Sequence, residues 1–449
     1  MLATAAAALA LASTSANLAQ GGTEPPLPPP SQAPSPGEIV AAAAPDDWVK
    51  IAADDLIVMT LAPDRDGNSR EVVIQLMPAP FSQGWVSNIR KLARAKWYDG
   101  VSVNRVQDNY VVQWGDPGHD NPESGEVETK PLPEGLKVME EDEYTVDHDA
   151  LADAQMEMSD SDDLRRSMGS AGFLWVADSA LEAVLSRPDL SESQRLEAIQ
   201  EYLEMTDGVT VYDTMSSEEI AMISIETTTT DTASQGWHQR DSYAAFVEFW
   251  KGWPIGNYEA DIQWYDDNDK KVPDPKLSRE EASKLGYFKD VGTSRFWPVH
   301  CYGMVGVGRN YSPDTGSGAE LYTVIGHAPR HLDRNIALVG RIVSGIEHLS
   351  SLPRGSGALG FYTEEEADKR TPILSVRVAS DLPASETASS SEAVGQPKRP
   401  TFEYLSTESE TFARYAEARA NRRDPFFIVP AGGADICNIP VPIREVTDE

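Results

Sequence analysis

The chain has 449 residues, of which 38 are basic and 72 are acidic, so its formal net charge is −34 at pH 7. A nucleic-acid-binding protein would show a basic stripe and a protein that binds anionic membranes would cluster Lys and Arg, so this balance argues against both classes. The length predicts two or three domains with enough chain for a large core.

The N-terminus predicts an export signal followed by a linker. Positions 2–12 are small and apolar, with a cleavage site near Ala19, so residues 1–19 are predicted to be a signal peptide too short to span a bilayer. No Lys or Arg precedes the apolar run, which leaves an Ala-rich leader as the alternative. Residues 20–45 are rich in Pro, Ser and Ala and predict an extended linker.

Strand and helix patterns follow from Trp48 onward. The runs "DDLIVMTL" and "REVVIQLM" are rich in β-branched residues, and the turn residues of "APDRDGNS" between them indicate a hairpin. The stretch "FSQGWVSNIRKLARAK" places Trp85, Ile89 and Leu92 at helical spacing, with Ser82 as a candidate N-cap. "WYDGVSVNRV" and "YVVQWGD" then return to strand character.

Residues 120–295 have the texture of an acidic insertion, partly helical and partly loop. A dense acidic tract precedes "SRPDLSESQRLEAIQEYLEM", in which Leu196, Ile199 and Leu203 keep a helical stripe. A low-complexity run of Thr and a cluster of Trp follow. Two interpretations stay open: a solvated excursion, or a surface that binds a protein partner.

Strand character returns over residues 296–383, which include a short helix at "SGIEHLSSL" and a last strand at "TPILSVRVAS". Residues 384–400 predict a second linker. The tail, 401–449, opens with an amphipathic helix, and its apolar end is expected to pack back on the body. The two cysteines, Cys301 and Cys437, form either one disulfide in an exported protein or two buried thiols.

Motifs for cofactor or covalent chemistry are weak throughout. Gly303, Gly306 and Gly308 have the reverse of the dinucleotide-binding spacing, so close strand packing explains these glycines better. The acidic loop near residue 268 lacks the glycine of an EF-hand, and no G-x-S-x-G elbow is present. Two cysteines among seven histidines give no zinc-ligand spacing.

Three ordered blocks resemble the cyclophilins. "WYDGVSVNRVQDNYVVQWGD" is similar to the family pattern F-Y-D-G-x-x-F-H-R-V-I-P-G-F-M-x-Q-G-G-D. "REVVIQLMPAPFSQGWVSNIRKLARAKWYDG" looks like the opening strand and helix, and "GMVGVGRNYSPDTGSGAELYTVIGHAPRHLDRNIALVGRIVSGIEHL" looks like the second half. The resemblance covers about 45–118 and 300–378 and is strongest to large exported bacterial members.

The resemblance implies a mainly β fold: a closed antiparallel β-barrel capped by helices, built from residues 46–119 and 296–383, with the insertion and the tail as additions. It also implies a peptidyl-prolyl cis/trans isomerase that needs no cofactor and acts on proline-containing unfolded or extended polypeptides in the bacterial envelope, so the expected location is periplasmic or secreted. A disulfide between Cys301 and Cys437 would then attach the tail to the second barrel block.

The resemblance also implies the site residues. Arg105 would be the catalytic donor, because a guanidinium stays charged and its planar fork is rigid, and Gln113 stands at the pocket glutamine. The positions implied to bind substrate are Tyr110, Val111, Gly308, Glu320, Tyr322, Leu332 and Ile336.

Several of these positions depart from the family pattern. Glu320 stands where the family has a second pocket glutamine, and an ionised carboxylate can only accept hydrogen bonds. Glu320 would therefore either pair with Arg105 and hold it, or neutralise it and weaken catalysis. Tyr110 and Tyr322 bring hydroxyls that need partners or water. The alternatives to an isomerase are a catalytically weak cyclophilin-like chaperone and a binding module that works through the insertion.

Overall fold

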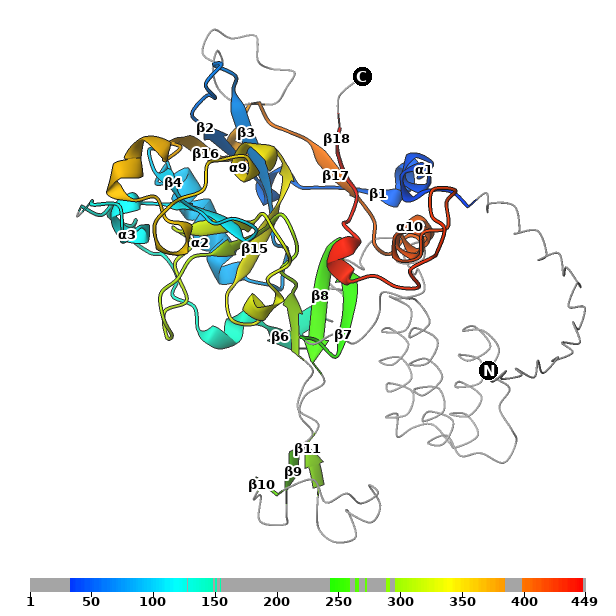
Figure 1. The fold of residues 1–449 in the computed structure, drawn as a ribbon. Helices are drawn as coiled ribbons and strands as arrows, with labels where there is room; N and C mark the ends of the chain where they lie inside the picture. Colours follow the sequence, from blue (N-terminus) through cyan, green and yellow to red (C-terminus); the bar gives the residue numbers. More distant parts are fainter. Residues whose placement is uncertain are drawn as a thin grey trace, which may run out of the picture.

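A computed structural model describes residues 33–126, 128–147, 150–151, 154, 243–258, 263–265, 271–272, 288–290, 295–383 and 398–446. An eight-stranded antiparallel sheet forms its centre (Figure 1). Its strands are β2 (Leu56–Leu61), β3 (Arg70–Leu76), β4 (Ser102–Val106), β5 (Val111–Gly115), β13 (Met304–Val307), β14 (Leu321–Val324), β15 (Leu338–Ser344) and β16 (Ile373–Val378). They follow the order β16-β2-β3-β15-β13-β14-β5-β4.

The two edge strands of this sheet meet. Ser102 forms an antiparallel bridge with Pro372, the Gly100 N–H donates to the Ile373 carbonyl at 2.9 Å, and the Ile373 N–H donates to the Val101 carbonyl at 2.8 Å. The sheet therefore closes on itself, which satisfies backbone groups that an open edge would leave exposed. The prediction of a mainly antiparallel β-barrel is confirmed.

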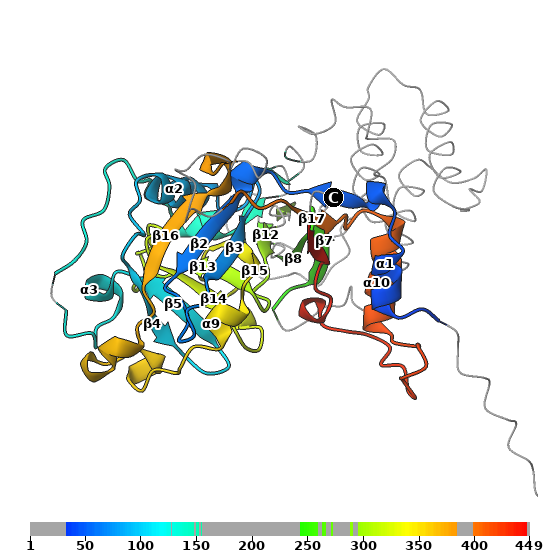
Figure 2. The same cartoon turned by 90° about the horizontal axis from the view of Figure 1, so that it is seen from above.

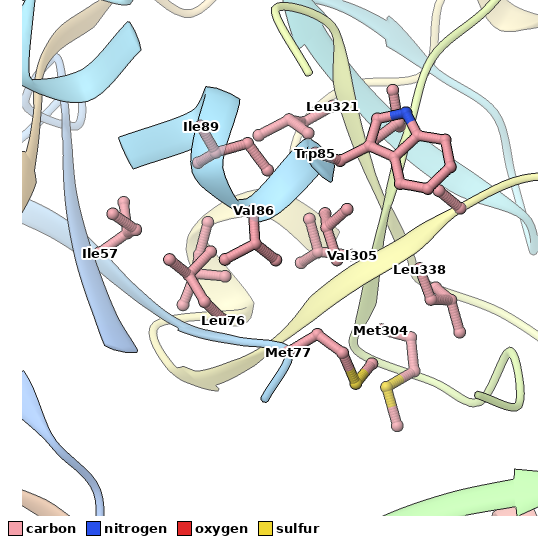
Figure 3. Close-up of a cluster of buried hydrophobic side chains, with 14 of the residues drawn as sticks. Ile57, Leu76, Met77, Trp85, Val86, Ile89, Met304, Val305, Leu321 and Leu338 are labelled. Atoms are coloured by element: carbon pink, nitrogen blue, oxygen red, sulfur yellow. The ribbon is translucent and has the colours of Figure 1, made fainter. Parts of the chain in front are cut away.

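Helix α2 (Gln83–Arg94) caps the barrel with its apolar face. Trp85, Ile89 and Leu92 are buried there, as their spacing predicts, and Figure 3 shows Trp85 and Ile89 pointing toward side chains of the barrel strands. Ser82 occupies the N-cap position of α2, as its place in the sequence predicts. Its backbone has a left-handed φ of 54°, and its side chain makes no capping hydrogen bond.

The described part of the insertion contributes strands. β6 (Val146–Asp147), β7 (Phe246–Trp250), β8 (Trp253–Tyr258) and β12 (Arg295–Pro298) form a sheet in the order β6-β12-β8-β7. β9 (Gln263–Tyr265), β10 (Lys271–Val272) and β11 (Phe288–Asp290) form a second small sheet. Trp253 and Trp297 are fully buried in the same hydrophobic cluster as the barrel core. The helix predicted around Leu196 lies outside the described residues.

The chain before the barrel pairs with the tail. β1 (Trp48–Lys50), β17 (Phe402–Leu405) and β18 (Ile443–Glu445) form a sheet in the order β1-β17-β18. Helix α1 (Pro36–Ala41) lies beside α10 (Glu410–Ala420), as Figure 2 shows. The prediction that residues 20–45 form an extended linker is therefore wrong for its end. Ser35 and Glu38 form a capping box that starts α1, and Ile39 is buried in a cluster with Phe412.

A disulfide joins Cys301 to Cys437, with their Cα atoms 5.1 Å apart. Beside it, Ile436 is buried in the barrel's core cluster. Other apolar residues of the tail are exposed: the side chains of Phe426 and Ile428 are 84% and 96% accessible. The end of the tail is thus attached to the body at the disulfide, and the loop before it is exposed to solvent.

Short helices complete the described chain. The α-helical turns are α3 (Pro117–Asp120) and α9 (Glu347–Ser350). The 3-10 turns are η1 (Pro45–Asp47), η2 (Ala53–Asp55), η3 (Glu141–Tyr144), η5 (Arg330–Leu332), η6 (Ala358–Gly360), η7 (Glu364–Lys369), η8 (Ala379–Asp381) and η10 (Ile436–Asn438). Within the described ranges, none of the helices has both the length and the apolar character needed to cross a membrane. The predicted signal peptide, 1–19, and most of the linker at 384–400 lie outside those ranges.

Candidate active site

Arg105 lies on β4 at an irregularity in the ladder. The pairing of β4 with β5 shifts register between Val103 and Arg105, which places Arg105 opposite Gln113. One terminal nitrogen of Arg105 donates to Oε1 of Gln113 at 3.2 Å, and Nε donates to the Leu359 carbonyl at 2.7 Å. The other terminal nitrogen donates to Oε1 of Gln107. Three polar contacts therefore hold the guanidinium plane in one orientation.

Aromatic rings also contact this guanidinium. Its carbon lies 5.6 Å from the centre of the Tyr110 ring and 5.4 Å from that of Phe361, within the range of cation–π attraction. Burial lowers the pKa of Arg105 below the usual arginine value, but an arginine stays charged under these conditions. The three bonds use three of the five N–H groups. One N–H on each terminal nitrogen has no partner among the described residues.

An apolar cluster, here named the socket cluster, lies next to Arg105. Val111, Tyr322 and Val324 are buried in it, and three partly buried side chains pack against them. Tyr110 links the cluster to Arg105, and its ring also stacks on His331 at 6.2 Å between centres. The three partly buried members are Tyr110, Leu332 and Ile336. The structure thus brings all five predicted apolar and aromatic positions together.

The hydroxyl of Tyr322 has a buried partner. It lies 2.8 Å from Nε2 of His300, and Nδ1 of the same ring lies 2.8 Å from a carboxylate oxygen of Asp333. Nε of Arg330 donates to the other oxygen of Asp333 at 2.6 Å. Burial by itself raises the pKa of Asp333, but the bonds from His300 and the charge of Arg330 outweigh it, so the net pKa is lowered. Burial raises the pKa of Tyr322 well above its usual value.

Glu320 does not pair with Arg105, the partner that its position in the sequence suggested. Its carboxylate bonds to Nδ1 of His119, a residue of α3, and no ion pair joins it to Arg105 in the described part of the chain. Gly308 lies against Glu320 and Gln113: a Cβ at position 308 would be 2.9 Å from Cβ of Glu320. The glycine therefore makes room for the carboxylate.

Gly306 makes room in the same way for Tyr322. The two residues are opposite each other on β13 and β14, and a Cβ at position 306 would lie 2.3 Å from the tyrosine hydroxyl. Close strand packing therefore accounts for the glycine at position 306, in line with the sequence-based interpretation.

Five contributing residues were missed by sequence reasoning. Gln107 had an available signal, because it lies two positions after Arg105, just past the end of β4, and alternate residues of an extended chain share a face. The others come from distant segments, and their spacing gives no indication of the contact: His119, His300, Leu359 and Phe361. Among the described residues, no group of three or more His, Cys, Asp or Glu side chains is placed to hold a metal ion.

Of the comparisons with known proteins, the match to a family model agrees with the resemblance. Residues 68–174 match the family model "Cyclophilin type peptidyl-prolyl cis-trans isomerase/CLD", so the chain carries a cyclophilin-type sequence that includes Arg105 and Gln113. No curated protein matches the chain. The chain is also similar to the crystal structure of the cyclophilin AquaCyp293 from Hirschia baltica. The alignment covers 90% of this chain and 94% of the AquaCyp293 chain, with 17% sequence identity and a TM-score of 0.45.

Proposed function

We propose that this chain, which carries a cyclophilin-type sequence over residues 68–174, is a peptidyl-prolyl cis/trans isomerase. The observation that carries the proposal is the placement of Arg105. Three contacts fix its guanidinium, two of its N–H groups stay without a partner among the described residues, and the socket cluster lies beside it. Such a combination offers an apolar surface for a proline ring and a fixed cationic donor next to it.

The chemistry requires little more than these two parts. The barrier to rotation about a peptide bond is about 18–20 kcal/mol, because resonance makes the C–N bond partly double. At Xaa-Pro the cis and trans forms are close in energy but exchange slowly. An N–H of Arg105 that donates to the prolyl nitrogen as it becomes pyramidal stabilises the twisted state more than either planar state. No covalent bond is broken, and no proton is transferred.

The substrates that we propose are unfolded or extended polypeptides that contain proline. Such segments present both the proline ring and the neighbouring carbonyl to a surface of this kind. The oxidised pair Cys301–Cys437 is consistent with a bacterial envelope compartment, since disulfides persist in oxidising environments. Together with the predicted signal peptide, it supports a periplasmic or secreted location. A protein partner for the acidic insertion stays a prediction.

One observation favours the second candidate, a catalytically weak cyclophilin-like chaperone. Glu320 places a carboxylate beside Gly308, and the side-chain amide of Gln113, which accepts a hydrogen bond from Arg105, lies near the same glycine. A carboxylate there would compete with a substrate carbonyl for donors, since it can only accept hydrogen bonds. The chaperone would bind proline-containing segments without accelerating their exchange.

The test is exchange across the Xaa-Pro bond of a short peptide, followed by NMR with and without the protein. We expect acceleration by the wild type and a loss of about 10²-fold or more in kcat/KM for Arg105→Ala, the usual cost of removing a donor to a transition state. Arg94→Ala serves as the control, because Arg94 is an exposed arginine on α2 paired with Asp54 and Asp381. A folded wild type that binds the peptide without accelerating exchange would favour the chaperone.

A further inference from the structure

The buried hydroxyl of Tyr322 ends a chain of four polar side chains that the isomerisation chemistry does not itself use. Tyr322, His300, Asp333 and Arg330 are 5%, 1%, 2% and 4% exposed. A buried polar group is costly unless it is hydrogen-bonded, so a network of this size in a core needs a compensating role. The position of the network indicates that role, because Tyr322 at one end of it is a buried member of the socket cluster.

The hydrogen bonds that link these four side chains have a defined direction. Both the backbone N–H and the side-chain Nδ1 of His300 lie against the same oxygen of Asp333, at 3.0 and 2.8 Å. Arg330 donates to the second oxygen and keeps the carboxylate ionised. If Nδ1–H donates to Asp333 and the ring carries no second proton, Nε2 has the free lone pair and accepts a hydrogen bond from the Tyr322 hydroxyl. The imidazole is thus held in the tautomer that anchors the tyrosine.

The neighbouring strand is shaped for the same hydroxyl. Gly306 lies opposite Tyr322, and any side chain there would meet the hydroxyl and the ring carbon that bears it. The rings of His300 and Tyr322 are nearly parallel, with 6° between their planes and 6.4 Å between their centres. The space, the acceptor and the orientation of that acceptor therefore all fit a tyrosine at this position rather than a phenylalanine.

We propose that His300 is a positioning residue of the isomerase site, acting through Tyr322. The bond to His300 fixes the tilt of the Tyr322 ring, and the ring is the surface on which the proline of the substrate packs. This inference rests on the proposed function for the identity of the substrate. Asp333 and Arg330 serve the same purpose one step further away, because they orient the imidazole.

Two matched substitutions separate positioning from general support of the fold. In His300→Asn the amide reaches the place of Nδ1, so it keeps the contact with Asp333 and loses the one with Tyr322. In His300→Gln the amide reaches the place of Nε2 and can accept the hydroxyl proton. We expect His300→Asn to lower kcat/KM by about three- to tenfold, the equivalent of one buried hydrogen bond. His300→Gln should stay within about twofold of the wild type.

A double-substitution cycle checks that the effect passes through the hydroxyl. In a Tyr322→Phe background, His300→Asn should cause no further loss of kcat/KM. Val58→Ala, a core substitution on β2 in a separate cluster, is the control for lowered stability: it should reduce the melting temperature and leave kcat/KM unchanged. Equal losses in the Asn and Gln variants, or a full Asn effect in the Tyr322→Phe background, would overturn the proposal.

NMR of the tyrosine ring keeps the inference separate from the proposed function. The wild type should show a slowly exchanging Tyr322 hydroxyl proton and slow ring flips. In His300→Asn the hydroxyl signal should disappear and the Tyr322 ring should flip faster. In His300→Gln the hydroxyl signal and the slow ring flips should both be kept. This readout applies even if the wild type accelerates no exchange and the proposed function fails. A rapidly exchanging hydroxyl in the wild type, or equal flip rates in the two variants, would contradict the positioning role. If the Asn variant does not fold, Tyr322→Phe replaces it in the ring-flip comparison only, because its ring also lacks the bond to His300 and should flip faster than the wild-type ring.

Discussion

Around Arg105, individual side chains decide how many donors remain for a substrate. Gln113, Gln107 and the Leu359 carbonyl each take one N–H and fix the plane of the guanidinium. Glu320 takes none of them, because its carboxylate bonds to His119. The His119 side chain is 59% exposed, whereas the Glu320 side chain is only 15% exposed. Solvent around His119 therefore screens the electrostatic attraction between the two side chains.

Glu320→Gln tests what the carboxylate does. An amide restores a donor to the site and removes a negative charge near Arg105, so we expect kcat/KM for a prolyl peptide to rise by about three- to tenfold. His119→Gln is the matched variant: it removes the Nδ1 contact of His119 with Glu320, frees the carboxylate, and should lower kcat/KM. The measurement is exchange NMR on both variants. No change in either would mean that Glu320 does not influence Arg105.

At the scale of elements, the segment after β15 covers the outer edge of β4. The N–H groups of Gly355 and Tyr362 donate to the carbonyls of Val106 and Asn104, and Phe361 bridges to Arg105 itself. The strand that carries Arg105 is therefore paired on both sides. Because a strand with two partners moves less than an edge strand, the segment contributes to holding the arginine in place.

β7 carries a titratable group with consequences for stability. Burial raises the pKa of Glu248 from 4.5 to about 7. Between these values the folded chain keeps a proton that the unfolded chain has released, so stability falls as pH rises through this window and stays lower above it. The Glu248→Gln side chain carries no charge. At about pH 8 the variant should therefore unfold at a higher denaturant concentration than the wild type, and its free energy of unfolding should be greater by up to roughly 3 kcal/mol.

The check is denaturant unfolding of both proteins at about pH 5 and about pH 8. The difference between them should shrink at the lower pH, where the wild-type carboxyl is protonated. A constant difference at both values would show that Glu248 ionises normally.

For the whole molecule, the tail is attached by one covalent bond. The disulfide Cys301–Cys437 closes a loop with a sequence separation of 136, and Ile436 beside it lies in the barrel core. Chain-entropy arguments give such a cross-link about 3–5 kcal/mol of stabilisation. Cys301 also follows His300 directly, so the tail is fastened next to the residue proposed to position Tyr322.

Reduction of the disulfide should therefore lower the midpoint of denaturant unfolding. The protein with both cysteines replaced, Cys301→Ser with Cys437→Ser, should show the same lowered midpoint and no response to reductant. Thiol titration establishes that reduction is complete. An unchanged midpoint in fully reduced wild type would indicate that noncovalent contacts alone hold the tail.

Local patterns predicted a large part of the barrel. The β2–β3 hairpin follows from two β-branched runs around a turn, and α2 follows from Trp85, Ile89 and Leu92 at helical spacing. α1 could have been found as well, because Ser35 and Glu38 have capping-box spacing, but the surrounding prolines favoured a linker. The strands of the insertion were missed because tryptophan-rich runs do not separate strand from loop by periodicity.

The sequence by itself determined the resemblance to cyclophilins, the two strands that carry Arg105 and Gln113, and the set of apolar positions around them. These depend on contacts between residues close in the chain or on an ordered motif. Only the tertiary structure decided the partners: His119 for Glu320, His300 for Tyr322, and Phe361 for Arg105. Each of these contacts joins segments far apart in the chain. No periodicity records such a contact, because barrel closure and the packing of loops on it set which side chains meet.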